Sequence, residues 1–136
     1  MKKIFVSTIL LLIISISFAQ KPAPKGVKAA DIYFEDVAAE FGTIEEGESK
    51  ELVFTFFNSG TAPLLLKNVK PACGCTTPEW PKQPIMPGKK GEIKATFNSK
   101  GYGGQNIHKS ITVTTNVPEN GNDKVIILYI KGFVKK

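Results

Sequence analysis

Apolar and polar residues alternate with a period of two along several short segments of this chain, which is the pattern of strands buried on one face. The alternating segments are 51–58, 92–98 and 107–114, with the inward sets Leu52, Phe54 and Phe56; Ile93, Ala95 and Phe97; and Ile107, Ile111 and Val113. No segment carries the convincing apolar stripe of an amphipathic helix. The pattern therefore predicts an all-β fold.

Three other segments complete the predicted set of strands. Residues 125–134 are almost continuously apolar, so we expect a central strand that is covered on both sides. Residues 31–37 and 64–69 are shorter candidates. Turn-forming residues separate the segments, at Glu46-Gly47, Asn58-Ser59-Gly60, Pro87-Gly88, 101–104 and Asn120-Gly121.

Short strands that are separated by such turns predict an antiparallel β-sandwich of the immunoglobulin type. Two packed sheets would then enclose one core. That core is expected to contain Phe54, Phe56, Phe97, Ile111, Leu128 and Ile130. An open barrel is the alternative arrangement of the same strands.

The first 30 residues have the composition of a leader that is not part of the sandwich. Lys2 and Lys3 precede an apolar run that ends in Ser17-Phe18-Ala19, so residues 1–19 are predicted to be a signal peptide cleaved after Ala19. The run is shorter than the roughly 20 apolar residues that span a bilayer. Residues 20–30 are expected to form a flexible leader and 31–136 the sandwich domain. We therefore expect a periplasmic or secreted protein without a transmembrane segment after cleavage.

The charge of the chain argues against nucleic acid as a partner. All 18 basic residues are lysine, and cleavage after Ala19 would leave 16 of them against 12 acidic residues, a net charge of +4. Bidentate recognition of guanine and of phosphate favours the planar guanidinium of arginine. The absence of arginine therefore predicts that the protein does not bind nucleic acid specifically.

The two cysteines, Cys73 and Cys75, form a CxC motif in an otherwise strand-forming sequence. In an extended strand their α-carbons would lie about 6.6 Å apart, whereas a disulfide prefers about 4.4 to 6.8 Å. A bridge would therefore need a local pinch of the backbone, which Gly74 is best able to allow. Closing so small a loop contributes only about 1.6 kcal/mol in the chain-entropy model, so the pair is not a global staple.

Several roles of the pair stay open. Cys73 and Cys75 are a local structural element, a labile redox pair, two thiolate ligands for Cu(I), or partners in mixed disulfides with other chains. Structural zinc needs four ligands, and two sulfurs with the single His108 do not supply them. His108 itself is expected to be a solvated residue on the polar face of its strand. We expect no cofactor, with copper as the alternative, and assign no metal site.

A proline-rich segment surrounds Trp80 and is the candidate binding loop. It contains five of the nine prolines of the chain, Pro71, Pro78, Pro81, Pro84 and Pro87. Proline donates no backbone hydrogen bond, so the segment is expected to form a crossing between sheets or a sheet edge. The candidate contact residues are Thr76, Pro78, Trp80 and Pro81. Trp80 is either an anchor for a protein or a glycan, or a lid that packs over the end of the core.

The order of the motifs resembles a bacterial family, the domain of unknown function family 1573, over residues 31–134. The resemblance rests on Phe41-Gly42-Thr43-Ile44 and Gly47; Phe54 through Asn58 with Gly60 and Pro63-Leu64; Cys73-Gly74-Cys75-Thr76; Pro78 with Trp80-Pro81; Pro84-Ile85 and Pro87-Gly88; Gly91-Glu92-Ile93; Ile111-Thr112-Val113; Asn116; and Ile130-Lys131-Gly132. The family implies an exported sandwich of the immunoglobulin, PapD or hydin type, and it implies no particular activity.

Two hypotheses for function follow. The first is a non-enzymatic module that binds an envelope or extracellular protein or glycan through 72–86, with Trp80 at its centre. The second is a thiol-redox or Cu(I)-handling protein that uses Cys73 and Cys75. Nucleophile-elbow, phosphate-loop and metalloprotease motifs do not occur in the sequence, so we expect the protein not to be an enzyme.

Overall fold

The computed structural model describes residues 29–136, and within this range it contains strands and no helix. The predicted signal peptide and residues 20–28 of the predicted leader lie outside the described residues. The strands are β1 (Ile32–Phe34), β2 (Ala38–Glu45), β3 (Ser49–Asn58), β4 (Leu66–Pro71), β5 (Thr76–Glu79), β6 (Lys90–Asn98), β7 (Gln105–Glu119) and β8 (Asn122–Lys135). In 29–136 we find no helix with the length and hydropathy needed to span a bilayer.

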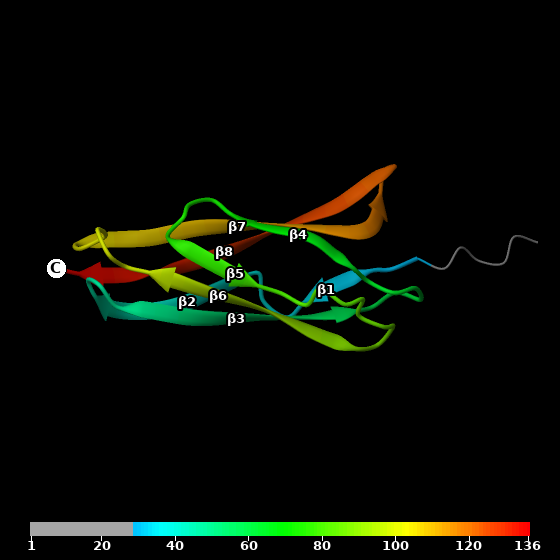
Figure 1. Cartoon of the computed structure of the whole chain (residues 1–136), viewed down its shortest axis with the longest axis horizontal. Coiled ribbons are helices and arrows are strands. Elements are labelled where there is room, and N and C mark those ends of the chain that lie inside the picture. Colours follow the sequence, from blue (N-terminus) through cyan, green and yellow to red (C-terminus); the bar gives the residue numbers. More distant parts are fainter. Residues whose placement is uncertain (1–28) are drawn as a thin grey trace, which may run out of the picture.

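Two four-stranded sheets form the layers of a sandwich, in the orders β1-β3-β6-β5 and β2-β8-β7-β4 (Figure 1). The prediction of an immunoglobulin-like sandwich is confirmed over the open barrel. Neighbouring strands are antiparallel except β2 and β8, which run parallel, so a purely antiparallel arrangement is wrong at this pair. The exception arises because the chain leaves β1, bends at 35–37 and crosses to the other sheet as β2 without reversing its direction.

The inward side chains of the two sheets meet in one hydrophobic core. Its largest fully buried apolar side chains are Phe54, Phe56, Phe97, Leu64, Ile93, Ile111, Leu128, Ile130, Val113 and Val134. All six core residues predicted from the alternation are at most 2% exposed. The predicted alternation is also reproduced, since every second residue of 52–58 in β3 and of 91–97 in β6 is buried. Sequence periodicity thus located the buried faces correctly.

Strand β8 differs from the prediction on one face. It is central in its sheet, between β2 and β7, but only the face that carries Leu128 and Ile130 is buried. On the opposite face Val125 is 49%, Ile127 37% and Phe133 36% exposed. The expectation that this strand is covered on both sides is therefore wrong. The two sheets pack on each other to form one core, and no third layer of the described residues covers the outer face of β8.

The described chain begins with contacts to the sandwich. Ala30 is buried, and the carbonyl oxygen of Ala29 accepts hydrogen bonds from the amides of Thr61 and Ala62 at 2.8 and 3.2 Å. These contacts place Ala29 and Ala30 in the sandwich, two residues ahead of the boundary expected at residue 31.

The next residue of the same segment, Asp31, also contacts the sandwich through its carboxylate. Burial works against its charge, but hydrogen bonds from the Ser59 hydroxyl and the Ile32 amide, with the Lys124 ammonium nearby, hold the pKa of Asp31 below its ordinary value. The ionised carboxylate therefore helps to hold the start of β1 on the turn after β3.

Candidate functional site

The proline-rich segment begins as a crossing between the sheets. The chain leaves β4 in one sheet at Pro71 and enters β5 in the other at Thr76. Within residues 29–136 strand β5 is the edge of its sheet and pairs with β6 alone, with Pro78 opposite Ala95. An edge position tolerates a residue without an N–H donor. The prediction that this segment forms a crossing and an edge is confirmed.

Cys73 and Cys75 lie in this crossing and are joined by a disulfide, with their α-carbons 5.3 Å apart. The backbone is thus pinched relative to the spacing of about 6.6 Å in an extended strand. Gly74 between them is exposed, its φ lies outside the left-handed region, and open space surrounds the position of a β-carbon. Gly74, which was expected to be best able to allow this pinch, thus occupies a position whose geometry would also accommodate a side chain.

The two sulfurs have different surroundings. Cys75 packs against the hydrophobic core, and its Sγ lies 3.8 Å from the hydroxyl oxygen of Thr76, which is 3% exposed. Thr76, a candidate contact residue, is therefore too buried to meet a partner directly. Among residues 29–136 no group of three or more His, Cys, Asp or Glu side chains is placed to hold a metal ion. A Cu(I) site at Cys73 and Cys75 stays a prediction that concerns the reduced protein.

His108 lies on β7 and is not part of a group of metal-ligating side chains among the described residues. Its ring packs on the ring of Tyr129, with 5.2 Å between the ring centroids, and the residue is exposed. This position agrees with the expectation of a solvated residue on the polar face of the strand. A role as third ligand beside the cysteines receives no support.

Trp80 follows β5, and its packing corresponds to the lid, one of the two roles that its sequence position left open. The side chain is half-buried and packs against the core, as a lid would. The ammonium of Lys82 lies 2.8 Å from the centroid of the ring, a cation–π contact. The indole Nε1 is buried and has no hydrogen-bond partner among the described residues.

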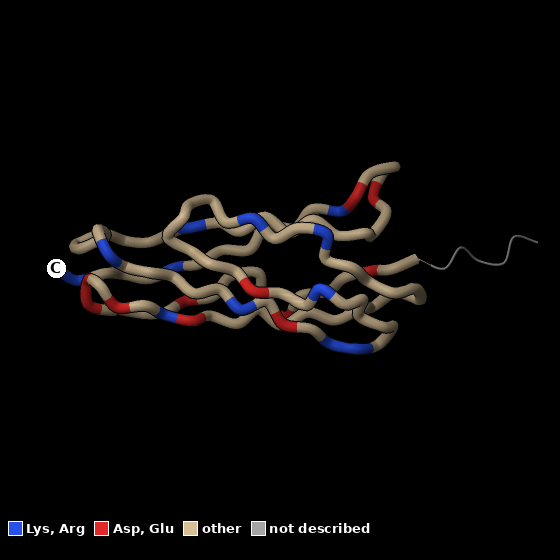
Figure 2. Tube along the Cα trace, in the orientation of Figure 1, with Lys and Arg blue, Asp and Glu red and all other residues tan. Residues whose placement is uncertain are grey.

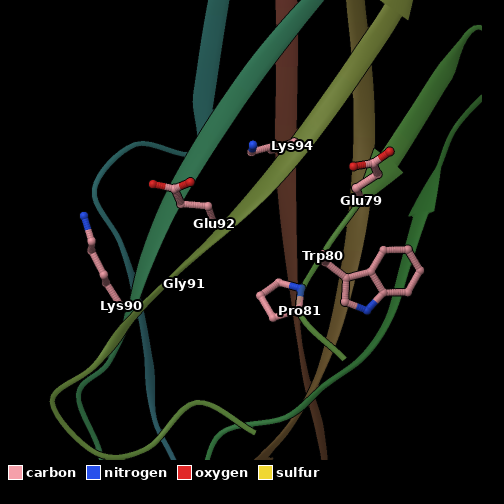
Figure 3. A pocket seen from close by; sticks show the side chains of 7 residues that line it. All are labelled: Glu79, Trp80, Pro81, Lys90, Gly91, Glu92 and Lys94. Atoms are coloured by element: carbon pink, nitrogen blue, oxygen red, sulfur yellow. The ribbon is translucent and has the colours of Figure 1, made fainter. Parts of the chain in front are cut away.

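A hollow of about 470 Å³ lies beside Trp80 at the β5 edge. Figure 3 shows its lining: Glu79, Trp80 and Pro81 from the end of β5, and Lys90, Gly91, Glu92 and Lys94 from β6. Two of the predicted contact residues, Trp80 and Pro81, thus meet here, whereas Pro78 lies in the edge strand and does not line the hollow.

The charged residues of the hollow were not predicted as a site. Lys90, Glu92 and Lys94 point outward from β6, and Glu79 lies opposite Lys94 in the ladder. The alternation of β6 in the sequence placed them on its polar face. What it lacked was the pairing of β5 with β6, which brings Glu79 and Trp80 alongside them.

The charges elsewhere on the molecule are mixed. Figure 2 shows basic and acidic residues interspersed along both sheets. A second hollow of about 480 Å³ lies over β2, β7 and β8 on the outer face of the other sheet, and His108, Lys131 and Phe133 are among its lining residues. Its lining residue Phe133 belongs, with Val125 and Ile127, to the exposed apolar strip of β8. The described residues thus include two hollows of comparable volume, one beside Trp80 and one on the opposite sheet.

Replacing Trp80 by phenylalanine is expected to change the free energy of unfolding by less than about 1 kcal/mol. The change removes an unpaired buried donor, whose desolvation costs about 1–3 kcal/mol, and this offsets the apolar contact that is lost. Trp80→Ala empties the position and is expected to cost about 2 kcal/mol. Urea denaturation followed by circular dichroism measures both. If the phenylalanine variant loses as much as the alanine variant, Nε1 has a partner that contributes to stability.

Both the sequence and the fold of this chain are similar to those of known proteins. The model of the family described as "Protein of unknown function (DUF1573)" matches residues 32–134. No curated protein matches the chain. A protein of unknown function from Porphyromonas gingivalis W83 has a similar structure, with 20% sequence identity and a TM-score of 0.67, over 84% of this chain and 51% of that one. The chain thus spans about half the length of that protein.

Two further structures of known type are similar. The ASH/PapD-like domain 7 of human CEP192 has 13% identity and a TM-score of 0.62, over 79% of this chain and 87% of that one. The CsuC–CsuE chaperone–tip adhesion subunit complex of Acinetobacter baumannii gives 13% and 0.59, over 78% of this chain and 53% of that one. At these identities the likeness establishes a PapD-like β-sandwich fold.

Proposed function

The chain belongs to the DUF1573 family, a family of unknown function, and from the geometry of the β5 edge we propose that it is a non-enzymatic interaction module of the cell envelope. The observation that carries the proposal is the hollow beside Trp80. It joins a rigid, proline-flanked aromatic residue to a row of exposed charges. Because the ring of Trp80 is already packed in place, its contact with a partner costs little conformational entropy.

The charges of the hollow favour a polypeptide over a neutral glycan. Lys90, Glu92 and Lys94 alternate in sign along β6, and Glu79 adds a further negative charge opposite Lys94. A partner segment with the opposite alternation would match them pair by pair. A sugar would instead need an open aromatic face, and the ammonium of Lys82 lies over the ring of Trp80.

The edge of β5 adds a second means of contact. Because β6 is the one partner of β5 in the part of the chain that the structure describes, the other side of β5 offers backbone groups to an incoming strand, although Pro78 interrupts the row of donors. In the CsuC–CsuE complex a chaperone of this fold type binds an adhesion subunit, which supports a role in protein interaction by analogy of fold alone.

An exported location and the absence of catalysis complete the proposal. The signal-peptide pattern of residues 1–19 supports export to the periplasm or the exterior. The ring of the single histidine, His108, packs at a tilt against the ring of Tyr129, which supports a binding role over acid–base catalysis.

We expect a photoactivatable crosslinker at Glu92 to capture an envelope protein in cells that export the chain, whereas the same group at Ile127 on the other sheet captures none. Lys94→Glu should weaken the capture about tenfold, because it opposes a like charge on the partner. The matched control is Lys70→Glu, an exposed charge on β4 that should leave capture unchanged. Capture from Ile127 alone would show that the partner binds the apolar strip of β8 and not the hollow beside Trp80. Capture of labelled envelope glycan instead of protein would contradict the choice of a polypeptide partner.

A further inference from the structure

The Cys73–Cys75 disulfide is not needed to hold the crossing in place. The amide of Ala72 donates to the carbonyl oxygen of Ser110 at 2.9 Å, and the amide of Asn98 donates to the carbonyl oxygen of Cys75 at 2.8 Å. These bonds fasten the crossing to β7 on one side of the bridge and to β6 on the other. The fold should therefore survive opening of the bridge, so the disulfide can be reduced while the protein stays folded.

The bridge is also approachable from solvent. Gly74 is exposed, and apart from the two cysteines beside it no described residue lies within 4 Å of the position where its side chain would begin. Cys73 and Cys75 are both half-buried, but of the two only Cys75 packs against the core. An incoming thiolate must reach one sulfur along the line of the S–S bond, so access favours attack on Cys73.

The surroundings of Cys75 suit a departing thiolate. Its Sγ lies 3.8 Å from the hydroxyl oxygen of the buried Thr76. When the S–S bond breaks toward Cys75, this hydroxyl is placed to donate a hydrogen bond to the sulfur that gains the charge. A stabilised thiolate is the better leaving group, so access and leaving-group stability select the same direction of cleavage.

We propose that Cys73–Cys75 is a thiol–disulfide exchange site that accepts two electrons from a dithiol. A thiolate of the dithiol attacks Sγ of Cys73, so that a mixed disulfide forms, the Cys73–Cys75 bond breaks, and the electron pair stays on Sγ of Cys75. The second thiol of the partner, as thiolate, then attacks the partner's first sulfur, which is bonded to Cys73 in the mixed disulfide. A disulfide forms within the partner, and Cys73 is released as a thiolate. The partner leaves as a disulfide, and both cysteines take up protons from water. This activity is independent of the interaction surface beside Trp80.

The test uses the protein as purified after export and dithiothreitol as the dithiol, with alkylation and mass spectrometry as the readout. We expect the bridge to be reduced while circular dichroism stays that of the folded protein. Thr76→Val, which removes the hydroxyl and keeps the shape, should slow the reduction about tenfold, the rate equivalent of one hydrogen bond to a charged group. Thr76→Ser retains the hydroxyl and should retain the rate, which separates this effect from a change in packing.

Single-cysteine variants test the direction of cleavage. Cys75→Ser leaves Cys73 free and should form a mixed disulfide with oxidised glutathione faster than Cys73→Ser, which leaves only the core-facing Cys75. A bridge that is reduced only after urea unfolds the protein overturns the proposal. Equal rates for the two variants, or an unchanged rate for Thr76→Val, overturn the assigned direction of attack or the role of Thr76, respectively.

Discussion

Asn58→Ala is expected to lower the free energy of unfolding by about 3 kcal/mol or more, because it removes three hydrogen bonds that a fully buried side chain makes to backbone groups. The side chain is fully buried at the end of β3. Its Nδ2 donates to the carbonyl oxygens of Ala62 and Ile85 at 2.7 and 2.8 Å, and its Oδ1 accepts from the amide of Gly60 at 2.9 Å. One amide group thus fastens the turn after β3 to the proline-rich segment. Urea denaturation followed by circular dichroism measures the loss.

Two matched variants separate hydrogen bonding from packing at Asn58. Asn68→Ala changes an exposed asparagine on β4 and should alter stability by less than about 0.5 kcal/mol. Asn58→Asp keeps the shape but turns an oxygen acceptor toward the carbonyl oxygens of Ala62 and Ile85 at neutral pH. It should therefore be at least as destabilising as Asn58→Ala. If the aspartate variant is as stable as the parent, the hydrogen bonds do not carry the effect.

Local patterns sufficed to predict the fold where one face of a strand is buried. In β3 and β6 burial follows the period of two, so the inward residues Phe54 and Phe97 could be read directly. Strand β8 shows the limit of that reasoning. Its continuous apolar run predicted two covered faces, but Ile127 remains exposed because coverage depends on what packs against a strand and not on the strand itself. The parallel pairing of β2 with β8 was not predicted either, because residues 38–45 were not among the predicted strands and the chain reaches β2 through the crossing at 35–37.

The candidate site was predicted only in part for the same reason. Prolines and the single tryptophan marked the segment near Trp80, because both residue types restrict a loop locally. The hollow itself needs Glu79 beside Lys94, two residues from different strands whose register is set by long-range pairing. Pairing between strands that are distant in sequence is not encoded in the local alternation. The burial of Thr76 was missed for the same reason, although its chemical type suggested a contact residue.

Gly91→Ala is expected to destabilise the protein by about 2–3 kcal/mol, as overpacking in a close-packed core does. Gly91 is the inward-facing residue of β6 directly opposite Phe56, and a β-carbon there would overlap the phenyl ring. Phe56 is fully buried, so its ring has no room to move aside. Gly74→Ala is the control: its position is open and its φ is ordinary, so it should be neutral or stabilising by up to about 1 kcal/mol.

A double variant identifies the Phe56 ring as the cause of that loss. Phe56→Leu alone should cost about 1–2 kcal/mol through lost contacts. In the presence of Phe56→Leu, however, the added methyl at position 91 occupies space that the ring has vacated. The pair should therefore be less destabilised than the sum of the two single variants by at least about 1 kcal/mol, a coupling of the size found for residues in contact. Strictly additive losses in urea denaturation would show that the cost at Gly91 arises from the backbone and not from the ring above it.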